Sequence, residues 1–195
     1  MREEQGSEVA ALVRRARQGD QAAWNALVER HTGLLWSVAR SFRFDDAVVA
    51  DVVQTSWLRL VEHLDDLAEP GAVGAWLATT VRRECLRLLR TARREVVAPD
   101  EQLEQVGADD PPVDASLLER ERDVLLWTAV DRLLPRCQRL LRVLMTSPPP
   151  SYTEVAAALD MPVGSIGPTR ARCLAHLRRQ LAESVSSVAQ RDSAG

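Results

Sequence analysis

The sequence SYTEVAAALDMPVGSIGPTRARCLAHLRRQL, residues 151–181, has the pattern of two helices separated by a short turn. Ser151 and Glu154 match a capping box, which predicts the start of a short helix. Asp160 to Gly164 predicts a turn, and Ser165 is expected to cap a longer helix that ends at about the last residue of this stretch. A short helix, a turn with glycine and a longer Arg-bearing helix are typical of a helix-turn-helix unit.

The second of these helices is predicted to have a buried and an exposed face. The buried face is expected to hold Ile166, Cys173, Leu174, Leu177 and Leu181. The opposite face carries Pro168, Ala171, Arg172, Ala175, Arg178 and Arg179. Small residues beside Arg would let this face enter a DNA major groove. Arg170 falls on the buried face, so we expect its stem to pack while its head reaches water. The same helix pair would also suit a plain helical bundle.

The remainder of the chain also shows helical spacing of its apolar residues. Helices are expected to begin at Asp20, at Asp45, near Ala72, after a capping box at Ser116–Glu119, and at Pro135. No useful run of alternating apolar and polar residues predicts a strand. The expected fold class is therefore all-α.

An acidic segment separates two helical blocks. Residues 95–114 contain seven acidic residues and no Arg, whereas the blocks on either side are net basic. Such a segment is typical of a linker. We predict a helical domain at 1–94, an acidic flexible linker at 95–115, a helix-turn-helix domain at 116–182 and a flexible tail at 183–195. The linker is either a solvated spacer or a segment that passes through a positively charged channel.

A strongly basic segment ends the first block. It contains Arg82, Arg83, Arg87, Arg90, Arg93 and Arg94, with Glu84 as its one acidic residue. Trp76 lies two turns before it. A basic face with a nearby aromatic ring suits single-stranded nucleic acid, because bases stack and guanidinium groups pair with phosphates. The alternative is a solvated helix face with Trp76 in the core.

Composition and motifs argue against several classes of protein. The opening MREEQGSE has no apolar region and no apolar run is long enough to span a membrane, so we expect a cytoplasmic protein without membrane insertion. Cys85, Cys137 and Cys173 lie far apart in the sequence, so neither a disulfide framework nor a zinc site is expected, and buried thiols would be inert. No catalytic, metal-binding or cofactor motif is found, so the chain is not expected to be an enzyme.

Taken together, five segments resemble the extracytoplasmic-function (ECF) sigma factors of bacteria, in the sigma-70 family. Domain 2 of that family is similar to ARQGDQAAWNALVERHTGLLWSVAR, DDAVVADVVQTSWLRLVEHLDDL and WLATTVRRECLRLLR. Domain 4 is similar to LPRCQRLLRVLM and SYTEVAAALDMPVGSIGPTRARCLAHLRRQL. The resemblance covers about residues 8–94 and 117–182, in the family's order.

The resemblance implies a subunit that binds core RNA polymerase, recognises the −35 and −10 elements of promoter DNA and helps to open the duplex. The expected polymerase contacts are the coiled coil of the largest subunit and the flap region. The residues implied to bind core polymerase are Asp51, Val52, Gln54, Thr55, Trp57 and Leu58. Those implied to bind the −10 element are Trp76, Arg82, Arg83, Arg87 and Arg90, with the loop at about 66–73 capturing an extruded base. Those implied to bind the −35 element are Ser165, Pro168, Thr169, Arg172 and Arg179.

The resemblance also implies control by an anti-sigma factor. The chain departs from the family pattern at Arg83, where many relatives have Asn, and at Gly167 and Pro168, where Lys and Ser are usual. Two other functions fit the residues alone. One is a stand-alone helix-turn-helix regulator, which would dimerise on palindromic sites. The other is a helical interaction module without a nucleic-acid role.

Overall fold

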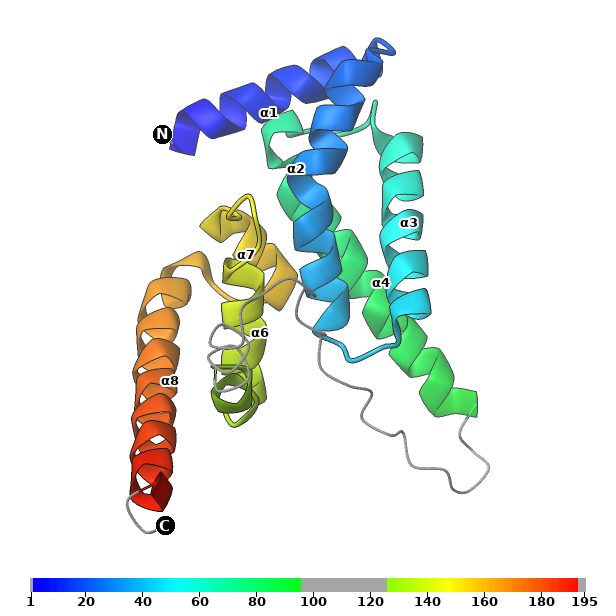
Figure 1. Ribbon diagram of the computed structural model, residues 1–195. Coiled ribbons are helices and arrows are strands. Elements are labelled where there is room, and N and C mark those ends of the chain that lie inside the picture. The colour runs from blue at the N-terminus through cyan, green and yellow to red at the C-terminus, as the bar shows by residue number, and fades with distance from the viewer. Residues whose placement is uncertain (1, 96–125, 193–195) are drawn as a thin grey trace. The chain divides into compact units, whose positions relative to one another are not determined.

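The computed structural model describes residues 2–95 and 126–192, and these residues contain helices and no strand (Figure 1). The helices are α1 (Arg2–Arg17), α2 (Gln21–Arg40), α3 (Asp46–His63), η1 (Pro70–Ala72), α4 (Val73–Glu95), α6 (Pro135–Leu144), α7 (Tyr152–Leu159) and α8 (Val163–Asp192). Residues 126–131 are also helical. The predicted all-α fold class is therefore confirmed. The predicted acidic linker, apart from Glu95 at the end of α4, and the capping box at Ser116–Glu119 lie outside the described residues.

Local capping explains where several helices begin. The Ala23 amide donates to the Asp20 carboxylate at 3.1 Å, which starts α2, and the Val48 amide donates to the Asp45 carboxylate at 2.8 Å, which starts α3. Each carboxylate satisfies an amide that has no partner within its own helix. These two predicted helix starts are confirmed.

The turn after α7 is shorter than predicted. Asp160 takes a left-handed conformation at φ 53° and its amide donates to the carbonyl of Ala156, which ends α7. Only three residues separate this helix from α8, which begins at Val163. Ser165 therefore lies inside the first turn of α8 and is not its N-cap, contrary to the prediction. The helix also continues to Asp192, beyond its predicted end and into the predicted tail.

The chain forms two compact units that do not follow the order of the sequence. The first unit is Met1–Val106 with Arg142–Val163, and the second is Gly107–Leu141 with Gly164–Gly195. The predicted domain limits remain a prediction, because most of the segment that would join the domains lies outside the described residues.

The first unit is built around α2. This helix packs against α1, α3 and α4, and Figure 1 shows α2, α3 and α4 side by side with α1 across one end. Its core contains the fully buried side chains of Val13, Leu27, Leu35, Val38, Val49, Val52, Leu60, Leu77 and Val81. This core fixes the rotation of α3 and α4, and so decides which of their side chains face outward.

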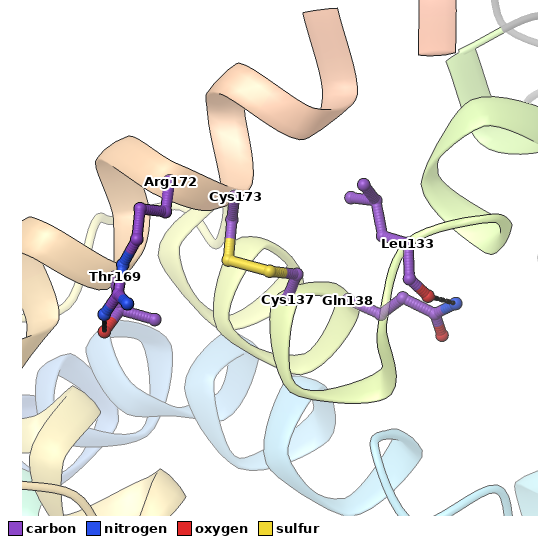
Figure 2. Close-up of a disulfide and its surroundings, with 6 residues drawn as sticks. All are labelled: Leu133, Cys137, Gln138, Thr169, Arg172 and Cys173. Carbon is purple, nitrogen blue, oxygen red and sulfur yellow. Dashed lines mark hydrogen bonds between the residues drawn. A yellow bond between two sulfur atoms is a disulfide. The ribbon is translucent and has the colours of Figure 1, made fainter. Parts of the chain in front are cut away.

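The second unit contains a disulfide between Cys137 of α6 and Cys173 of α8 (Figure 2). The two Cα atoms are 5.3 Å apart although the residues are 36 positions apart in the sequence. The expectation that the chain has no disulfide is therefore wrong. The spacing of cysteines in a sequence can indicate pairs that are close along the chain. Cys137 and Cys173 are far apart along the chain and meet only because α6 packs against α8. Closing a loop of this length stabilises a fold by about 4 kcal/mol in the chain-entropy model.

Gln138, next to Cys137, fixes the turn that leads into α6. Its side-chain amide donates to the carbonyls of Asp131 and Leu133, at 2.8 and 2.9 Å, and the residue is buried. These bonds satisfy carbonyls that the preceding helix leaves without partners. The start of α6, and with it Cys137, is thereby held in place.

Candidate nucleic-acid interface

One face of α3 is exposed along most of its length. Asp51, Gln54, Leu58 and Val61 are exposed and recur at helical spacing. The exposed fraction is 57% for Leu58 and 57% for Val61. Neighbouring exposed aliphatic side chains on one helix face are typical of a surface that another protein covers. We call these four residues the α3 face.

The structure changes the residue set that the sequence predicted for α3. Val52 is 1% exposed and belongs to the core, so it is not available as a surface contact. Thr55 and Trp57 are half-buried, and the Trp57 ring packs edge-on against Trp24 with 5.8 Å between ring centroids. Val61 was missed by the sequence analysis, although its position three residues after Leu58 places it on the same helix face.

A hollow of about 650 Å³ opens beside the start of α4. The side chains around it that carry charge, hydroxyl groups or rings are Arg59, His63, Glu69, Trp76, Thr79, Thr80 and Arg83. The rings of His63 and Trp76 are 6.1 Å apart between centroids and tilted by 40°. Rings beside cationic groups are suited to a stacked base and its phosphates.

A buried carboxylate joins α3 to α4 beside this hollow. The side chain of Glu84 is 8% exposed and pairs with Arg59 at 3.0 Å and with Arg87 at 2.6 Å. The hydrogen bond and the negative charge of Glu84 both raise the pKa of Arg87. Glu84 was not among the predicted site residues, and its one signal in the sequence is its position as the single acid within a basic segment.

The predicted −10 residues on α4 do not share one environment. Arg83 and Arg90 are exposed, and Trp76 is half-buried beside the hollow. Arg82 is turned away from them: its side chain is 21% exposed and its guanidinium group pairs with Asp160 at 3.1 Å. Arg87 is also exposed but pairs with Glu84, so Arg82 and Arg87 are held by carboxylates whereas Arg83 and Arg90 are two further exposed cations.

Glu154 closes the capping box at the start of α7 and also contacts α2. Its carboxylate accepts from the Ser151 amide at 2.6 Å and lies 3.4 Å from Nδ1 of the buried His31. A Cβ atom added to Gly74 would overlap this carboxylate, so a larger residue there would displace Glu154 from this position. Burial raises the pKa of Glu154, but hydrogen bonds from His31 and Ser151 outweigh it, and the pKa lies below its ordinary value.

This lowered pKa predicts a loss of stability in acid. Because the folded state favours the ionised carboxylate, its contribution is complete above the ordinary pKa of 4.5 and is lost as the pH falls through the lower folded value. We expect Glu154→Gln to flatten this part of the curve of thermal midpoint against pH, measured down to about pH 3. The exposed Glu29→Gln is the control. An unchanged acid dependence in Glu154→Gln would contradict the assignment.

At most positions of α8, the exposed and buried residues are those that the sequence predicted. Pro168, Arg172 and Arg179 are exposed, as predicted, whereas Ile166 and Cys173 are buried. Arg170, expected to have a packed stem, is also exposed.

Thr169 is the exception among the predicted −35 residues. It is 5% exposed, so it does not lie on the exposed face of α8, and Arg172 donates to its hydroxyl at 3.5 Å (Figure 2). Its place three residues after Ile166 and four before Cys173 puts it on the buried face. The buried hydroxyl therefore supports the exposed Arg172 from beneath.

Comparison with known proteins shows similarity to sigma factors. The family described as Sigma-70 region 2 matches residues 27–95. The chain is 29% identical over 177 residues to the RNA polymerase sigma factor NccH of Alcaligenes xylosoxydans xylosoxydans, covering 89% of this chain and 95% of NccH. It is 29% identical over 164 residues to the ECF RNA polymerase sigma-E factor of Escherichia coli K12, covering 80% and 84% of the two chains. Residues 27–95 therefore match a sigma-70 region, and the chain is similar to sigma factors of the ECF type over most of its length.

Two solved structures share the fold of this chain. CnrH, solved in complex with the cytosolic domain of CnrY, aligns with a TM-score of 0.56 and 24% identity, covering 90% of this chain and 97% of CnrH. The sigma factor RpoE of Bartonella quintana, solved with the anti-sigma factor NepR, aligns with a TM-score of 0.59 and 22% identity, covering 81% and 97%. No helix within residues 2–95 or 126–192 has the length and hydropathy needed to span a bilayer.

Proposed function

We propose that this chain is a sigma factor that binds core RNA polymerase and directs it to particular promoters. The observation that carries the proposal is the Sigma-70 region 2 match, which includes both the α3 face and the basic surface of α4. The proposed activity is binding and duplex opening, without catalysis of a covalent step. Its proposed location is the cytoplasm, where bacterial polymerase acts.

The α3 face is the proposed contact with the polymerase. Leu58 and Val61 supply the apolar area, and Asp51 and Gln54 continue the same helix face with polar groups. A helix face with anchors three and four residues apart fits against another helical surface. The expected partner is the coiled coil of the largest subunit, with the flap region as a second contact for the C-terminal part of the chain.

The surface of α4 is the proposed −10 interface. Arg83 and Arg90 are exposed for phosphate contacts along the strand. The hollow beside Trp76 and His63 has the rings and the volume to hold an extruded base. Separating one base from its stack in this way favours the open duplex, because the protein then stabilises the unpaired strand.

The exposed face of α8 is the proposed −35 interface. Arg172 and Arg179 project from the side of the helix opposite the buried Ile166 and Cys173. Arg172 is the proposed base-reading residue, because an Arg can form two hydrogen bonds with guanine in the major groove. Arg179 is the proposed phosphate contact.

An anti-sigma factor is the proposed regulator. Of the two similar structures, RpoE was solved with the anti-sigma factor NepR, and CnrH was solved with the cytosolic domain of CnrY. By analogy, a partner of this kind would cover surfaces needed for transcription, of which the apolar α3 face is the clearest example. Its binding would then compete with core polymerase.

Binding to bacterial core RNA polymerase tests the proposed function. We expect the purified chain to elute together with core enzyme on size exclusion, and the complex to give run-off transcripts from specific genomic fragments. Core enzyme alone is the control. Failure to bind core, together with binding of the free chain to palindromic DNA as a dimer, would overturn the proposal in favour of a stand-alone regulator.

A further inference from the structure

The disulfide between Cys137 and Cys173 joins two very different positions. Cys137 is the third residue of α6 and is partly exposed. Cys173 lies well inside α8 and is 1% exposed. An external thiol or disulfide can therefore approach the sulfur of Cys137 but not that of Cys173.

The electrostatic environment also distinguishes the two sulfur atoms. The first turn of a helix carries a partial positive charge, which stabilises a thiolate there. Cys137 has this position in α6, whereas Cys173 is remote from both ends of α8. Access and charge therefore agree in making Cys137 the more reactive member of the pair.

We propose that Cys137 and Cys173 form a thiol–disulfide exchange site, entered at Cys137, whose redox state controls the helix that reads the −35 element. The co-reactant is a low-molecular-weight thiol and its disulfide. During oxidation, the Cys137 thiolate attacks the small disulfide and releases one small thiol. The Cys173 thiolate then attacks the sulfur of Cys137 and releases the second. The two protein thiols lose two electrons and two protons, and one small disulfide becomes two small thiols.

The coupling to DNA recognition follows from the position of Cys173. It is the residue after Arg172, the proposed base-reading residue, and it lies on the same buried face as Thr169, which Arg172 contacts. The disulfide therefore holds α8 against α6 directly beneath the DNA-facing surface (Figure 2). This part of the inference rests on the proposed function. In a reducing compartment, disulfides are typically transient and redox-sensing rather than structural.

Cys85 provides an internal reference in the same chain. It is fully buried in α4 and is not part of the disulfide. Burial and the nearby charge of Glu84 raise its pKa to about 12. Cys85 should therefore stay unmodified wherever Cys137 reacts in the folded protein.

The chemistry is tested first on the wild-type chain, without polymerase or DNA. The oxidised protein is treated with reduced glutathione, quenched at intervals by alkylation and analysed by peptide mass spectrometry. We expect complete and reversible reduction, with glutathione found on Cys137 during the reaction and Cys85 unmodified. A disulfide that resists excess reduced glutathione, or glutathione that accumulates on Cys173, would overturn the proposal.

Two matched variants give a second measure of the same asymmetry. Cys173→Ser keeps the exposed thiol and should form a stable mixed disulfide with oxidised glutathione. Cys137→Ser keeps only the buried thiol of Cys173. This variant should react with oxidised glutathione at least about tenfold more slowly, because Cys173 is buried and lies away from the positively charged end of its helix. Circular dichroism establishes that both variants fold. Equal rates in two folded variants would contradict entry at Cys137.

Transcription tests the coupling. We expect the reduced protein to give at least about fivefold less transcript than the oxidised protein from a promoter that requires its −35 element. The polymerase concentration is set so that core binding is saturated in both states. Equal transcription in the two states would overturn the coupling. If neither state supports transcription, the proposed sigma function fails, while the exchange chemistry is judged by the preceding experiments.

Discussion

Replacing Leu58 and Val61 together by Asp is expected to weaken binding to core RNA polymerase by at least about 30-fold, or about 2 kcal/mol. Both side chains are 57% exposed and lie on the α3 face, so the change removes apolar contact area without opening the core. It also places two carboxylates in a surface that a partner would bury, which adds a desolvation cost. Titration of labelled core enzyme measures the dissociation constant.

The matched control for this experiment is Leu58→Met, which retains an exposed apolar side chain at the same position. It should bind core enzyme almost as well as the wild type. The thermal midpoint of the double variant should change little, because surface substitutions away from caps and buried networks have small effects on stability. Unchanged binding by a folded double variant would show that the polymerase contacts another face.

Replacing Arg172 by Ala is expected to weaken binding to the preferred promoter by about 1–3 kcal/mol. At limiting protein concentration, transcription from that promoter should fall by roughly 5- to 150-fold. The loss should be largest for one −35 base pair and should disappear when that base pair is changed, because a base-reading Arg discriminates at a single position. Run-off transcription on promoters altered one −35 position at a time measures this.

Arg170→Ala is the matched control, since Arg170 is also an exposed Arg on α8 but lies at a different angle around the helix. It should leave the promoter preference unchanged. Arg90→Ala on α4 should instead weaken binding evenly across promoters and reduce its salt dependence. An even, sequence-independent loss from Arg172→Ala would assign Arg172 to the phosphate backbone rather than to a base.

Features with a local cause were predictable from the sequence. Asp20, Asp45 and the Ser151–Glu154 box each bind amides within a few residues, so their positions reveal where helices start. The first helix, α1, was not marked out individually by the sequence analysis, because it is polar and opens without a recognised cap.

Features that depend on packing between distant segments were not predictable. The Cys137–Cys173 disulfide requires α6 and α8 to meet, and the pairing of Glu84 with Arg59 requires α3 and α4 to meet. The burial of Thr169 was an error of another kind. Its residue type suggested a polar contact with DNA, whereas its spacing from Ile166 already placed it on the buried face.

The pairing of Glu84 with Arg59 and Arg87 has a consequence for how this surface responds to ions. Binding of a single strand to free cations releases the counterions condensed on its phosphates, and the logarithm of the binding constant falls by about 0.7 for each phosphate neutralised per unit of log salt concentration. Glu84 carries one negative charge and is shared by Arg59 and Arg87, so the three side chains together contribute one net positive charge to this release instead of two. Among the described side chains, the sensitivity of −10 binding to ionic strength should therefore follow Arg83, Arg90 and the one net charge of this trio, and be weaker than the number of Arg residues suggests.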